Sequence, residues 1–288
     1  MDIYTIYPQC GEFKKITREN FESDTKKGYP WYRKTGNHQS HYAICPSCNN
    51  PIEIVRLYPK TIDSNKPYGR HTKHSISDLA EYDRAKLSTC PLYRPITFNK
   101  NNKKHDIDNE SFNIIKLLAR DFYKIALFCK QLIGVDLSKN KLAQMLERYF
   151  LEQGYLYSAS TTINIPWMFL YFSDSTSLYS QKITDTTLKK AIVENVPEAF
   201  ISDQGYVERK DGFVMINIAF IHHRSFKKNQ QAGEMLNMVV TGRTNQVIFE
   251  KEIIFDYDAY QNFLVGHDLD YQKLAISIIR QIIPGIPI

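Results

Sequence analysis

Cys45 and Cys48, in the segment HYAICPSCNNPIEI (residues 41–54), are spaced so that both thiolates can ligate one metal ion. Two cysteines separated by two residues reach the same tetrahedral ion when the chain turns sharply between them. The Asn-Asn-Pro run that follows supplies residues that favour a turn. The apolar residues before Cys45 and the alternating Ile52 and Ile54 predict a strand on each side. The pattern is typical of a zinc knuckle.

One such pair supplies two of the four ligands that a closed zinc site needs, and residues 71–90 hold the best further donors. We expect Cys45, Cys48, His71 and Cys90 to bind structural Zn2+ within a module of residues 42–93. His74 is an alternate ligand or a basic surface residue, and Cys10 is a weaker candidate. Such a site would add folding energy to a segment with little core of its own.

Two other interpretations of the cysteines stay open. Cys45 and Cys48 could form a redox pair, although the helix start that usually accompanies such a pair is missing from this part of the sequence. They could also be unrelated thiols in a reducing cytosol. Cys129 lies on the apolar side of a predicted helix, and we interpret it as a core thiol.

The segment around this cluster is rich in basic and aromatic residues. Residues 1–105 contain 18 Lys and Arg against 10 Asp and Glu, a net charge of +8, whereas the remainder carries 19 against 21. Cations neutralise phosphates and aromatic rings stack on unpaired bases, so the composition favours nucleic-acid binding. A solvated basic face around a thin core is the alternative. The candidate nucleic-acid contacts are Lys14, Lys15, Arg33, Lys34, Arg56, Arg70 and Lys73.

The elements that must position these residues divide the chain into two expected domains. The polar run at residues 99–105 predicts a linker or an exposed loop. We therefore expect a basic zinc module over residues 1–105 and a mixed domain over residues 106–288. The predicted class is α+β, with the zinc-knuckle module first, then helices, then antiparallel β-hairpins.

Apolar periodicity predicts several helices in the second domain. The first runs from about Ser111 to Ile133 and ends at Gly134, and the second starts after Ser138 and reaches Gly154. Residues 186–194 predict a further helix that begins at Thr184 or Asp185. Two more are expected near residues 257–264 and 270–282. The apolar run at 167–172, which follows Pro166, is ambiguous.

Strand patterns follow these helices. Residues 206–210 and 213–220 predict a β-hairpin with an Asp-Gly turn, and residues 236–240 and 247–255 predict a second pair.

The sequence contains no P-loop, serine-hydrolase elbow or H-E-x-x-H helix, and so it does not point to those enzyme classes. It also has no signal-peptide pattern and no run of 18 apolar residues, so we expect a cytoplasmic protein outside the membrane. Composition is compatible with a prokaryote or a mobile element.

Three functions follow as hypotheses. The first is a zinc-stabilised nucleic-acid-binding protein without catalysis of its own. The second is an adaptor subunit of a multiprotein system such as phage defence, in which helix 271–282 packs on a partner protein or on a second copy. The third is a metal-dependent nuclease that uses His222 and His223, although polar residues at a strand end explain these histidines more simply.

Overall fold

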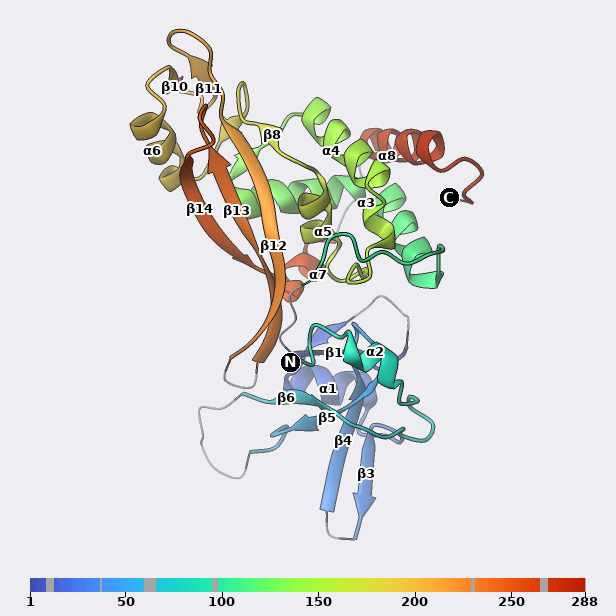
Figure 1. Ribbon diagram of the computed structural model, residues 1–288. Coiled ribbons are helices and arrows are strands. Elements are labelled where there is room, and N and C mark those ends of the chain that lie inside the picture. Colours follow the sequence, from blue (N-terminus) through green and yellow to red (C-terminus); the bar gives the residue numbers. More distant parts are fainter. Residues whose placement is uncertain are drawn as a thin grey trace. The chain divides into compact units, whose positions relative to one another are not determined.

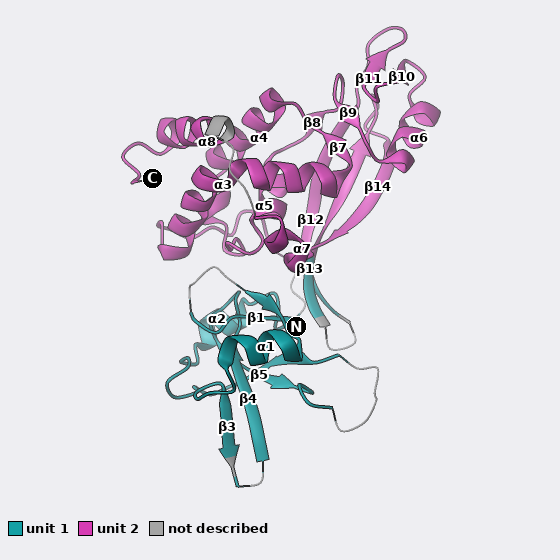
Figure 2. Ribbon diagram, turned by 180° about the vertical axis from the view of Figure 1, so that it is seen from behind, with its two compact units in different colours: residues 1–97, 224–234 teal, residues 98–223, 235–288 magenta. Residues whose placement is uncertain are grey.

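The computed structural model has an α+β architecture with two compact units (Figures 1 and 2). It describes residues 1–8, 13–36, 38–59, 66–94, 98–228, 231–264 and 269–287. Unit 1 contains residues 1–97 and 224–234, and unit 2 contains residues 98–223 and 235–288. The chain first passes between units at residue 97, inside the span assigned from sequence to the zinc module. The sequence did not indicate that residues 224–234 belong to the first unit.

Unit 1 is built on an antiparallel sheet in the order β3-β4-β5-β6. A small β1-β2 pair and two helices accompany it, as Figure 1 shows in blue and teal. Its elements are β1 (Ile3–Tyr4), β2 (Lys14–Lys15), α1 (Arg18–Thr25), β3 (Tyr32–Thr35), β4 (His38–Ile44), β5 (Pro51–Val55), β6 (Tyr68–His71) and α2 (Arg84–Ser88).

Helix α1 packs on one face of this sheet. It begins at Thr17, whose side chain accepts a hydrogen bond from the amide of Asn20, a typical N-cap. Its fully buried Phe21 contacts the rings of Tyr32 and His41. Because β3 and β4 pair Tyr32 with His41, both side chains belong to the same face, which forms the core of unit 1.

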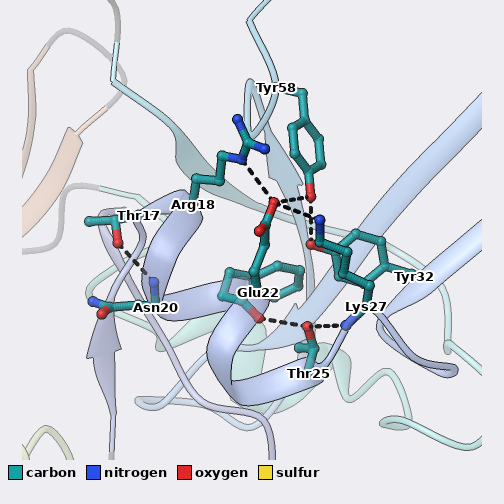
Figure 3. A network of polar contacts seen from close by, with 9 residues as sticks. Thr17, Arg18, Asn20, Glu22, Thr25, Lys27, Tyr32 and Tyr58 are labelled. Carbon is teal, nitrogen blue, oxygen red and sulfur yellow. Dashed lines mark hydrogen bonds and ion pairs between the residues drawn. The ribbon is translucent and has the colours of Figure 1, made fainter.

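A polar network around Glu22 also holds α1 in place (Figure 3). The Glu22 carboxylate accepts hydrogen bonds from Arg18 and from the hydroxyl of Tyr58, and it pairs with Lys27 at 3.2 Å. The hydroxyls of Tyr58 and Tyr32 lie 2.9 Å apart. The network therefore links the helix to strand β3 and to the segment after β5.

Unit 2 combines a helical cluster with a second antiparallel sheet in the order β14-β13-β12-β8 (Figure 1). Short pairs β7-β9 and β10-β11 complete it. Its elements are α3 (Asn109–Ile133), β7 (Val135–Asp136), α4 (Lys139–Leu151), η1 (Gly154–Leu156), α5 (Ile165–Phe172), β8 (Thr176–Ser177), β9 (Lys182–Ile183), α6 (Thr186–Asn195), β10 (Ala199–Ile201), β11 (Val207–Arg209), β12 (Asn217–Lys228), β13 (Gln231–Thr241), β14 (Val247–Ile254), α7 (Tyr257–Asn262) and α8 (Leu269–Ile282).

The predicted helices of this unit are confirmed. Helix α3 is capped by Asp108 and ends at Gly134, which has a φ of +68° and so takes the left-handed conformation that favours glycine. Ser138 caps α4 and Asp185 caps α6. The ambiguous apolar run is the wholly buried helix α5, with proline in its first turn.

One predicted hairpin is wrong. Strand β11 pairs with β10 and not with the segment after Gly212, and β12 starts only at Asn217. A two-residue type I′ turn needs a positive φ at both central residues. Gly212 has a φ of +60°, but Asp211 does not take a positive φ, so the tight turn does not form. The second predicted pair is confirmed as β13 and β14.

Candidate metal centre

The turn between β4 and β5 brings Cys45 and Cys48 to one point. The last pair of that ladder joins Ile44 to Pro51. The amide of Cys45 donates to the carbonyl of Asn50 at 2.9 Å, and the amide of Asn49 donates to the carbonyl of Cys45 at 2.9 Å. The chain therefore reverses within six residues, as the knuckle pattern predicts, and both thiols are buried.

His71 reaches the knuckle because of strand register. It is the last residue of β6 and pairs with Ile52, which follows the knuckle in β5. The amide of Thr72 then donates to the carbonyl of Pro51 at 3.0 Å, which extends the pairing by one step. The rings of His71 and Tyr93 also form a T-shaped pair.

Cys90 comes from the short turn after helix α2. Asp83 caps that helix, and the amide of Cys90 donates to the carbonyl of Leu87 at 3.2 Å. The amide of Tyr93 in turn donates to the carbonyl of Cys90 at 3.1 Å. These contacts fix the backbone of Cys90, whose thiol is buried beside the other three donors.

The four donor atoms have the spacing of a tetrahedral site. The Sγ atoms of Cys45 and Cys90 lie 3.8 Å apart, and His71 Nε2 lies 3.4 Å from Cys48 Sγ and 3.7 Å from Cys90 Sγ. Zinc bonds to sulfur and nitrogen place such pairs about 3.8 Å and about 3.6 Å apart. All four atoms lie within 4.8 Å of one another, so they can hold one metal ion.

Burial and hydrogen bonding shift the pKa values of the three thiols in different directions. Burial raises the pKa of both Cys45 and Cys90. The pKa of Cys48 is lowered, because it accepts hydrogen bonds from Cys45, Cys90 and His71. A metal ion binds thiolates and a neutral imidazole, so binding here must release protons from the buried thiols.

Asn50 contacts the cluster through its side chain. It was not identified as a site residue from the sequence. Its side chain is fully buried, and its Nδ2 atom lies 3.4 Å from Cys48 Sγ. Its Oδ1 atom accepts a hydrogen bond of 2.8 Å from the amide of Asp83, at the start of α2. Asn50 therefore ties the knuckle to the segment that carries Cys90. The sequence did not indicate this role, because an asparagine before a proline is typical of a turn.

The remaining histidine and cysteine candidates lie outside the cluster. His74 is exposed and does not belong to the group of four. Cys10 lies outside the described residues. Cys129 is buried on α3 and donates to the carbonyl of Pro166 at 3.4 Å, as expected of a core thiol. Every cysteine in the described ranges is a free thiol.

The predicted nucleic-acid contacts fall into two groups. Lys14 and Arg70 pair with Asp24 and Glu53, and Arg33 donates to Ser77. The other four are exposed and have no ion-pair partner among the residues that the structure describes. These four free cations are Lys15, Lys34, Arg56 and Lys73.

The two histidines of the nuclease hypothesis differ in burial: His223 lies in an aromatic core, and His222 is exposed. His223 is 1% exposed; its Nδ1 lies 2.9 Å from the hydroxyl of Tyr157, and its ring stacks on Phe98 and Phe255. Across the described ranges, the His, Cys, Asp and Glu groups close enough to hold a metal ion do not include His222 or His223. These contacts give His223 a packing role.

No protein-family model, curated protein or solved structure matches this chain. In the part of the chain that the structure describes, none of the helices has the length and apolar character needed to span a membrane. The function is therefore argued from the site and its surroundings.

Proposed function

We propose that this chain is a zinc-stabilised nucleic-acid-binding protein without catalysis of its own. The observation that carries the proposal is a cluster of four protein ligands inside the more basic unit. Three thiolates and one imidazole at tetrahedral spacing form a donor set that favours zinc. Four protein ligands leave no open position for a substrate or a reacting water, so the metal is structural and acts as a clasp.

The charge of unit 1 supports nucleic acid as the partner. Unit 1 carries 18 Lys and Arg against 11 Asp and Glu, a net of +7, whereas unit 2 carries 19 against 20. The free cations Lys15, Lys34, Arg56 and Lys73 are available to neutralise phosphates, because no described carboxylate pairs with them.

Salt-dependent binding tests the proposal. We expect the full chain to bind a labelled DNA or RNA at low salt, with an affinity that falls linearly on a log–log plot against salt. Lys34→Gln and Lys73→Gln should each reduce that slope by about one. The matched control, Lys210→Gln, changes an exposed lysine of unit 2 and should leave the slope unchanged. Absence of binding to every single strand and duplex at low salt would overturn the proposal.

The proposal includes a cytoplasmic location in a prokaryote or one of its mobile elements. A thiolate-ligated site needs a compartment that keeps cysteines reduced, and the described cysteines are all free thiols.

A second function, an adaptor in a larger assembly, is favoured by exposed apolar side chains in unit 2. Phe213 is 67% exposed, Val247 58% and Val193 54%, and a contiguous patch of such side chains would mark a protein-protein interface. Helix α8 is a weaker candidate for the docking element, because it packs on α3 and α4 and buries Ala275 and Ile279. Light scattering and a pull-down with Phe213→Ser as the comparison variant test this function.

A further inference from the structure

The sheet of unit 1 has a second face that its core does not use. Directly paired residues of an antiparallel ladder lie on the same face. The register places Tyr42, Glu53 and Arg70 in one row across β4, β5 and β6, and Val55 and Tyr68 in the next row on that face. We call these residues, together with Arg33, the open face.

Alternation along the strands sends the neighbouring residues to the core. Ala43, Ile52 and Ile54 are buried, and His71 reaches the metal cluster. Tyr42, Val55 and Tyr68 are half-buried, and Arg70 is exposed. The open face is therefore the solvent side of the sheet, and the cluster of Cys45, Cys48, His71 and Cys90 lies on its core side.

The contacts place cations and aromatic rings side by side on the open face. The guanidinium carbon of Arg33 lies 5.9 Å from the centre of the Tyr42 ring and 5.0 Å from that of Tyr29. Arg70 forms an ion pair with Glu53. The Glu53 carboxylate raises the pKa of Arg70, and Tyr68 and Tyr42 add to this effect, as neighbours of the guanidinium do.

The two central tyrosines are free to meet a ligand. Neither the Tyr42 nor the Tyr68 hydroxyl has a hydrogen-bond partner within the described ranges. The core residue Tyr4, by contrast, buries its ring, and its hydroxyl donates to Asp24. Half-exposed rings beside guanidinium groups are instead the combination that stacks on bases and pairs with phosphates.

We propose that the open face binds single-stranded nucleic acid, with bases stacked on Tyr42 and Tyr68 and phosphates bound by Arg70. This inference rests on the proposed function and names its substrate class. In a duplex, each base is stacked on its neighbours and cannot stack on a protein ring. Only unpaired bases can therefore stack on the tyrosine rings of the open face. The net charge of unit 1 fits a polyanion, and Arg70 can turn from Glu53 to a phosphate at an exposed site.

The metal site and the open face share strand β6. His71 and Arg70 are neighbours on β6, and one faces the metal while the other belongs to the open face. Binding of the metal to His71 therefore fixes the strand that presents Arg70 and Tyr68.

Fluorescence anisotropy with the full, metal-loaded chain tests the inference. The probes are labelled twenty-nucleotide oligothymidylate, oligouridylate and a twenty-base-pair DNA duplex. We expect both single strands to bind at least tenfold more tightly than the duplex. Tyr42→Leu and Tyr68→Leu should each weaken single-strand binding on the order of tenfold or more, because they keep apolar volume and remove the ring. Tyr42→Phe should retain affinity.

Tyr179→Leu, at an exposed tyrosine of unit 2, is the matched control and should bind like the unaltered chain. Metal content verifies that each variant keeps its fold, and Tyr68→Leu provides an independent answer if Tyr42→Leu does not fold. Equal binding of duplex and single strand, with both leucine variants unaffected, would overturn this inference and leave the proposed function standing. Loss of binding to all three probes in the unaltered chain would overturn both.

Discussion

The Sγ atoms of Cys45 and Cys90 lie 3.8 Å apart, although 45 residues separate the two thiols in the sequence. A disulfide would bring the sulfurs to about 2.05 Å, and unrelated buried thiols have no reason to converge with a third thiol and an imidazole. The distance matches two ligands of one tetrahedral ion. The cluster therefore joins the knuckle to the end of the segment that follows β6.

Chelation should loosen unit 1 and leave unit 2 folded. A metal ion in the cluster would join the turn between β4 and β5, strand β6 and the turn after α2, whereas the core of unit 2 is centred on α3 and the fully buried α5. Hydrogen exchange after treatment with a strong chelator measures this. Amides of residues 51–55 and 68–71 should lose protection, and those of α3 should keep theirs. Equal loss in both units would contradict the assignment of the metal to unit 1.

Asn50→Ala should weaken metal binding about 10- to 100-fold, since residues that orient ligands from the outer shell have effects of this size. The substitution removes the contact with Cys48 Sγ and leaves the Asp83 amide without its acceptor. A competition titration against a colorimetric zinc chelator gives the affinity. His74→Ala is the control and should bind zinc normally, because His74 is exposed and outside the cluster. If His74→Ala weakened zinc binding and Asn50→Ala did not, the supporting role assigned to Asn50 would be wrong.

Glu22→Gln should change how stability depends on acid. Hydrogen bonds from Arg18 and Tyr58 lower the pKa of Glu22 from 4.5 to about 2. A group whose pKa is lower in the folded state stabilises the fold above its unfolded pKa and loses that effect as pH falls through the folded pKa. The difference in unfolding midpoint between the unaltered chain and the variant should thus shrink from pH 4.5 toward pH 2. A constant difference over this window would contradict the network of Figure 3.

Asp121→Ala should destabilise unit 2 by about 3–5 kcal/mol, because it leaves a buried cation without its partner. The Asp121 side chain is 3% exposed and binds Lys124 at 2.7 Å and Arg120 at 2.6 Å. Denaturant unfolding, followed by the fluorescence of Trp167 in the core of unit 2, measures the change. Lys190→Ala, at an exposed pair with Glu194, is the control and should cost less than about 1 kcal/mol.

Local signals predicted most of the helices because each boundary is set by neighbouring residues. Asp108 and Gly134 delimit α3, and Ser138 starts α4, through contacts within one turn. The Asp-Gly turn failed because pairing of β11 depends on β10, which lies before it in the chain. Gly154–Leu156 forms a 3-10 turn in which Gly154 lies against the ring of Tyr149.

The candidate site was predictable for a different reason. Cysteine and histidine are rare in the sequence, so residues 71–90 contain few possible metal ligands to complete a site with Cys45 and Cys48. The register of β5 and β6 brings His71, and not His74, to the cysteines. This register could not be predicted from the sequence. The open face could not be predicted either, because the alternation that places Tyr42 and Tyr68 together spans three strands.

Metal analysis of purified protein is the most direct test of the central claim, that Cys45, Cys48, His71 and Cys90 form a zinc clasp. We predict about one zinc per chain in the unaltered protein and in Cys129→Ser, whose thiol is buried in unit 2. Cys45→Ser should lose the zinc and the fold of unit 1. A purified chain without zinc, together with a Cys45→Ser variant that folds like the unaltered protein, would contradict the account.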